Sequence, residues 1–99
     1  MLSDPFFSLA VRRSDDGTVV TVAGELDVAT APELARALAD AEGQVTVDLS
    51  ATTFADPAAL RVLLAARADG LRIRVVPRRG GQVARLLALT QTEELLTVA

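Results

Sequence analysis

The sequence predicts a single α/β domain, with helices packed against a mixed sheet of four or five strands. Three segments alternate apolar with polar residues, the pattern of a strand with one buried face, and a mostly apolar segment precedes them. After each of the three alternating segments, apolar residues recur every three or four positions, the pattern of a helix. The order is therefore strand, strand, helix, strand, helix, strand, helix, and a short last strand is expected over residues 95–98. At 99 residues, the chain has the length of one domain.

The first two strands are expected to form a hairpin. Residues 6–11 are mostly apolar, and residues 18–23 alternate. The Asp16-Gly17 pair between them favours the turns with positive φ that join antiparallel strands. Residues 1–5 are expected to form a loose arm before the domain.

The first helix is expected to begin at Thr30. Thr30 and Glu33 have the spacing of a capping box, with Thr30 as the N-cap. Pro32 is tolerated because it lies in the first turn, where its missing N–H has no partner to lose. Leu34 and Leu38 then fall on the buried side of the helix.

The stretch 45–69 is the centre of the predicted fold. Residues 45–49 alternate as a core strand, and residues 57–69 have helical spacing. Asp56 is expected to cap this helix, with Pro57 at its first position. A helix that starts at the end of a core strand is a preferred place for recognition.

The last part of the chain predicts one more strand and one more helix. Residues 71–75 alternate, with Arg72 and Arg74 on the face in water. Residues 77–81 are interpreted as a surface loop, because they lack the lysine and the strand-to-helix setting of a phosphate-binding loop. Residues 83–90 have helical spacing. Strands separated by helices are expected to be parallel, with right-handed crossovers.

Several of the residues that enzymes use most often in catalysis are missing from the chain, although this does not exclude catalysis. The chain has no His and no Cys, and all ten of its basic residues are Arg. A Ser-His-Asp triad, a thiol nucleophile, a Schiff-base lysine and a Walker A lysine are therefore impossible, so we expect neither an enzyme nor a cofactor. The net charge of −3 argues against binding to nucleic acid. No apolar run is long enough to span a membrane, and a cytoplasmic protein is expected because no secretory signal or disulfide is visible.

Three short motifs occur in an order that resembles the STAS domain of bacterial anti-sigma factor antagonists. Residues 24–27 read GELD, like the turn after the second strand of that family. Residues 48–50 read DLS, like the end of its core strand. Residues 54–60 read FADPAAL, where the family has an F-x-D-S-S-G-L-like segment that opens the next helix. The resemblance covers roughly residues 7–98.

The resemblance implies a protein-interaction module that is not an enzyme. Such a module binds an anti-sigma factor of the serine-kinase type and thereby frees a sigma factor. In the family, the kinase phosphorylates a serine at the helix start, but that position here is Ala58, which has no hydroxyl, and Pro57 replaces the neighbouring serine. The nearest hydroxyls, on Thr52 and Thr53, are expected in the turn before Asp56. The implied member has no phospho-switch.

Seven residues are the candidate partner-binding site. Ala58, Arg61 and Val62 lie opposite the predicted buried face of their helix, where a small apolar patch beside a charge suits a protein partner. The candidates are Asp27, Thr30, Asp56, Pro57, Ala58, Arg61 and Val62.

Several alternatives stay open from the sequence alone. Asp27 and Asp56 equally suit a structural role as caps, and a single exposed Val among alanines is ordinary in a helix. No metal site is expected from Asp27, Asp48 and Asp56, since the resemblance gives these residues no such role. A different function for the whole domain is that of an accessory subunit in a larger complex, such as a lipid-transport ABC system. The oligomeric state is left open.

Overall fold

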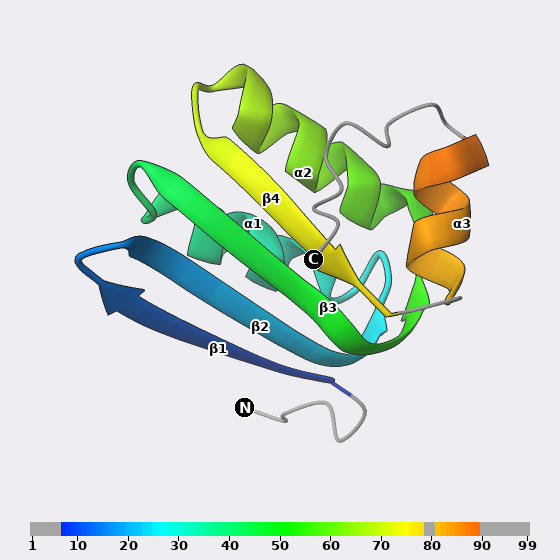
Figure 1. The fold of residues 1–99 in the computed structure, drawn as a ribbon. Helices are drawn as coiled ribbons and strands as arrows, with labels where there is room; N and C mark the ends of the chain where they lie inside the picture. The colour runs from blue at the N-terminus through cyan, green and yellow to red at the C-terminus, as the bar shows by residue number, and fades with distance from the viewer. Residues whose placement is uncertain (1–6, 79–80, 90–99) are drawn as a thin grey trace.

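The computed structural model describes residues 7–78 and 81–89, and these residues form a four-stranded sheet with three helices (Figure 1). In chain order the elements are β1 (Phe7–Ser14), β2 (Gly17–Leu26), α1 (Ala31–Ala39), β3 (Gln44–Ala55), α2 (Pro57–Ala68), β4 (Arg72–Pro77) and α3 (Gln82–Leu89). This order confirms the predicted succession of strands and helices. The predicted arm over 1–5 and the predicted last strand over 95–98 lie outside the described residues.

The strands lie in the order β1-β2-β3-β4. β1 pairs with β2 antiparallel, whereas β2 with β3 and β3 with β4 pair parallel, which confirms the predicted mixed sheet. Figure 1 shows α1 and α2 side by side on one face of the sheet and α3 at the end where β4 finishes. The helices that connect the parallel strands therefore cover a single face.

The hairpin between β1 and β2 requires a glycine. Gly17 has a φ of +128°, which side chains of L-residues rarely adopt. A Cβ atom added there would lie 2.5 Å from the backbone oxygen of Gln44 on β3. The turn therefore lies close to the start of β3. The pairing of β1 with β2 continues to Ser14, so β1 is longer than the predicted strand, which ends at residue 11.

The core is aliphatic and lies between the sheet and the helices. The register places Val20, Val47 and Val75 in one row across β2, β3 and β4, and all three are fully buried. Leucines from the helices meet this row, including Leu34 of α1 and Leu63 of α2. Each such side chain contributes roughly 1.5–3 kcal/mol by leaving water.

β3 runs further than the sequence predicts. The expected strand ends at residue 49 and is followed by a turn, but the structure continues it to Ala55, paired with the end of β2. Thr52 is the physical reason, because it is buried in the strand and its hydroxyl donates to the Val22 carbonyl oxygen at 3.1 Å. The expectation that Thr52 and Thr53 lie in a turn is therefore wrong. As a consequence, α2 begins directly at the edge of the sheet.

Candidate partner-binding site

Two of the predicted site segments meet where β2 and β3 end. Leu26 and Ala55 are register partners at the ends of these parallel strands. The next residue of each strand is a candidate, Asp27 after β2 and Asp56 after β3. The backbone N–H of Asp56 donates to the Leu26 carbonyl oxygen at 2.9 Å, which ties the two segments together. Figure 1 shows the turn after β2 beside the start of α2.

The turn from Asp27 to Thr30 is a capping box, three residues earlier than the predicted one. The Asp27 carboxylate accepts hydrogen bonds from the backbone N–H groups of Ala29 and Thr30, both at 3.0 Å. In return, the Thr30 hydroxyl oxygen accepts from the Asp27 N–H at 2.8 Å. Asp27 thus caps the turn that leads into α1, and Thr30 occupies the place of the third residue in this box.

Thr30 stands at the N-cap position of α1, as predicted, but the predicted capping box with Glu33 is wrong. Thr30 makes no side-chain bond to the first turn of α1. Glu33 instead pairs with Arg36, at 3.2 Å, on the surface of the helix. Since Thr30 is buried and its hydroxyl also lies 2.9 Å from the Glu25 carbonyl oxygen, its place in the site is to hold the turn.

The start of α2 has the predicted geometry. The Asp56 carboxylate accepts from the Ala58 N–H at 2.9 Å, and Pro57 occupies the first helical position. Pro57 is exposed and Ala58 is half-buried. No acidic residue lies in the first turn, so only small apolar groups face outward there.

Two exposed apolar side chains at the same edge were not predicted as site residues. Val28, in the capped turn, is 69% exposed, and Phe54, near the end of β3, is 41% exposed. The register of β3 shifts against β2 at this point, so that Thr53 is passed over and Phe54 faces outward. Phe54 is part of a motif in the sequence, but its exposure depends on this irregular pairing. We refer to Val28, Phe54, Pro57 and Ala58 together as the exposed edge, because all four lie within three residues of the paired strand ends Leu26 and Ala55.

Arg61 and Val62 lie one turn further along α2, on a groove rather than on an isolated patch. The groove runs between α1 and α2 and has a volume of about 550 Å³. Val62 is half-buried in its floor, and Arg61 is exposed on its rim. On the other side, Ala35 and Ala39 of α1 form the wall. The seven candidates therefore fall into two neighbouring groups, one at the strand ends and one on the groove.

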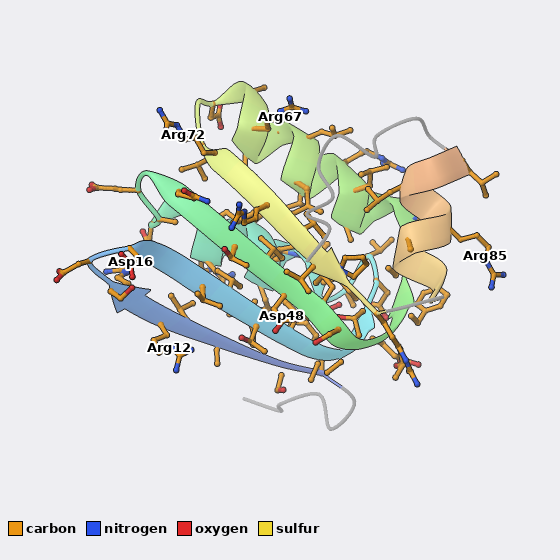
Figure 2. All side chains as sticks on the ribbon, in the orientation of Figure 1. Arg12, Asp16, Asp48, Arg67, Arg72 and Arg85 are labelled. Carbon is orange, nitrogen blue, oxygen red and sulfur yellow. The ribbon has the colours of Figure 1, made fainter. Side chains whose placement is uncertain are left out.

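Within the described residues, no three carboxylates or other metal-binding groups come together. Asp48, labelled in Figure 2, alternates with the buried Val47 and Leu49 and so lies on the sheet face away from the helices. Its carboxylate accepts from the Ser50 hydroxyl at 2.6 Å and from the Ser50 N–H at 2.9 Å.

In the part of the chain that the structure describes, no helix is long and apolar enough to cross a membrane.

Comparison with known proteins supplies a family. Residues 9–97 match the family model described as "Mlab, STAS domain". An anti-sigma factor antagonist from Mycobacterium paratuberculosis has a similar structure, with 31% sequence identity and a TM-score of 0.80 over 99% of this chain and 92% of that one. No curated protein matches the chain.

Two further solved structures share the fold at lower identity. One is an anti-sigma factor antagonist STAS domain from Rhodobacter sphaeroides, with 21% identity and a TM-score of 0.58 over 96% of this chain and 100% of that one. The other is the anti-sigma factor antagonist SpoIIAA in its unphosphorylated form, with 17% identity and a TM-score of 0.67 over 94% and 87%.

Proposed function

The chain belongs to the STAS domain family, and on that basis we propose that it is an anti-sigma factor antagonist of the cytoplasm that acts by binding and not by catalysis. It would occupy an anti-sigma factor and so release the sigma factor. The observation that carries this proposal is the exposed edge. It unites an apolar surface with a rigidly capped helix start, the two features that a protein partner can bind without reshaping the domain.

The contacts around the exposed edge support a rigid docking surface. Asp27 and Asp56 each use a carboxylate to hold backbone N–H groups, at 2.9–3.0 Å. Both carboxylates therefore serve as caps that position their neighbours. The groups left to contact a partner are Val28, Phe54 and Ala58, with Arg61 and Val62 at the border toward the groove.

The proposed antagonist has no phospho-switch at this surface. Ala58 has no hydroxyl, and the hydroxyls of Thr30 and Thr52 are buried and engaged with backbone carbonyl oxygens, while Thr53 is exposed on β3 and not on the helix start. A phosphate adds almost two negative charges and would disrupt an apolar contact. Without this phosphate, the fraction of the anti-sigma factor that is bound depends only on the concentration of the antagonist relative to the dissociation constant of the complex.

The test is capture of the partner with two matched variants. Wild type, Ala58→Asp and Ala10→Asp would each be used as bait, with bound proteins identified by mass spectrometry. Asp is tolerated in the first turn of a helix, so Ala58→Asp keeps the fold, which circular dichroism checks. Ala10→Asp adds the same charge at an exposed position of β1, far from the exposed edge.

The expected result is an anti-sigma factor that wild type and Ala10→Asp retain and Ala58→Asp loses. The captured protein must also release a sigma factor when wild type is added, measured by transcription with purified components. Capture of an anti-sigma factor equally by all three baits would place the binding surface elsewhere. No release of a sigma factor by wild type would refute antagonism.

A second function is favoured by the missing hydroxyl at Ala58. An accessory subunit of a larger complex, such as a lipid-transport ABC system, needs no reversible switch. The same capture experiment separates the two functions, because this one predicts a transporter ATPase as the retained protein in place of an anti-sigma factor.

A further inference from the structure

The α1/α2 groove has a charged ridge along one wall. Arg61, Ala65 and Asp69 follow one another at intervals of four residues, so they lie in line along α2. All three are exposed and border the groove. The opposite wall carries Ala35 and Ala39, whose small side chains leave room for a second helix.

The ridge is complementary to itself. Arg61 stands at one end, Asp69 at the other, and Ala65 lies midway between them. At 1.5 Å per residue, the two charges are about 12 Å apart along the helix axis. A second α2 placed antiparallel, with a two-fold axis at Ala65, would bring Arg61 of each copy opposite Asp69 of the other. A two-fold axis makes every such contact twice.

Both charges lack an intramolecular partner in the part of the chain that the structure describes. Asp69 is moreover the C-cap of α2. An acidic side chain at that end is unfavourable with the helix dipole, so a cation brought by a neighbour offsets a cost that the isolated domain bears.

We propose that the α1/α2 groove is the interface of a homodimer, in which the two α2 helices pack antiparallel about an axis at Ala65. The floor of the groove supplies the apolar contact, through the half-buried Val62 and Leu71. The alanines on its walls permit the short helix separation, about 8 Å, that small contact residues allow. Arg61 and Asp69 fix the direction and register of the pair.

The charges alone favour a second copy of this chain over an unrelated helix as the occupant of the groove. An unrelated helix would need an acid and a base in the right order and about 12 Å apart. A second copy carries both in that order by symmetry. The dimer would also cover Arg61 and Val62, so if the proposed antagonism uses them, dimer and antagonist complex exclude each other. Only this last consequence rests on the proposed function.

Disulfide trapping tests the axis directly, because the chain contains no cysteine. Ala65→Cys places one thiol per copy at the proposed axis, where the Cα atoms of the two copies come within the roughly 4.4–6.8 Å that a disulfide needs. Ala10→Cys, exposed on β1, is the matched control. Under mild oxidation, Ala65→Cys is expected to form a covalent dimer at protein concentrations where Ala10→Cys stays monomeric.

Charge reversal tests the register. Arg61→Glu and Asp69→Arg, each alone, place like charges opposite each other twice per dimer, and each is expected to raise the dissociation constant measured by sedimentation at least about tenfold. The double variant Arg61→Glu with Asp69→Arg exchanges the two charges and is expected to restore the dimer. Circular dichroism shows whether each variant is folded.

The outcomes are decisive because the purified protein alone is measured. A folded wild type that sediments as a monomer up to millimolar concentration would overturn the proposal. So would equal cross-linking of the two cysteine variants, or a double variant as weak as either single one. None of these results bears on capture of an anti-sigma factor, so failure of the dimer and failure of the proposed function are distinguishable.

Discussion

Removal of the Thr30 hydroxyl should destabilise the whole domain. Val keeps the shape of Thr but can neither accept from the Asp27 N–H nor donate to the Glu25 carbonyl oxygen, which lie 2.8 and 2.9 Å from the hydroxyl oxygen. An N–H left without a partner in a buried place costs about 1–3 kcal/mol. Both contacts of the hydroxyl are only part-buried, so water can replace part of what is lost. We therefore expect a loss of about 1–3 kcal/mol for Thr30→Val.

Urea unfolding followed by far-UV circular dichroism is the suitable assay. The chain has no Trp or Tyr, so intrinsic fluorescence is a weak signal. The midpoint should fall while the slope with urea stays constant, as expected when only the folded state loses stability. Thr21→Val, at an exposed position of β2, is the control and should change stability by less than about 0.5 kcal/mol.

A double-mutant cycle identifies the capping box as the cause. Asp27→Ala removes the other half of the box and should cost about 1 kcal/mol. Because both side chains hold the same turn, the loss in the double variant should be smaller than the sum of the single losses. A Thr30→Val variant as stable as wild type, or losses that simply add, would refute the view that Asp27 and Thr30 act as one unit.

Three other substitutions test the fold and the site. Gly17→Ala should cost more stability than Gly70→Ala in the same urea assay, because both glycines have positive φ but only the Cβ at Gly17 would meet a backbone oxygen of β3; equal losses would contradict the close approach. Leu49→Ala should cost about 2–5 kcal/mol, since Leu49 is 1% exposed and a cavity would remain; a loss under about 1 kcal/mol would show that the core around β3 can collapse. Ala58→Ser should make the protein a substrate of an anti-sigma factor kinase that binds it, measured by phosphate incorporation, whereas wild type stays unmodified; labelling of wild type would place an acceptor elsewhere.

The sequence predicts the elements well because their signals are local. Alternation in 45–49 and helical spacing in 57–69 depend on near neighbours along the chain. The cap by Asp56 and the place of Pro57 depend on positions within one turn. The structure confirms all of these. The side chains on the core face of the central strands follow from the same alternation.

The wrong capping box shows where local signals compete. Asp27 with Thr30 and Thr30 with Glu33 have the same spacing, so the sequence permits either pair. The decision comes from β2, because Leu26 pairs with Ala55 at the end of the sheet and the chain turns away at the next residue. Asp27 therefore caps the turn, while Thr30 keeps the N-cap position of α1 without a side-chain bond to the first turn.

The sequence by itself determined the α/β order, the aliphatic core and the absence of a hydroxyl at Ala58. Only the tertiary structure decided that β3 continues to Ala55, that Phe54 faces outward, and that Val62 lies in a groove. The physical reason is common to these three features. Each depends on a contact between segments far apart in the chain: β3 with β2 for the first two, and α2 with α1 for the groove.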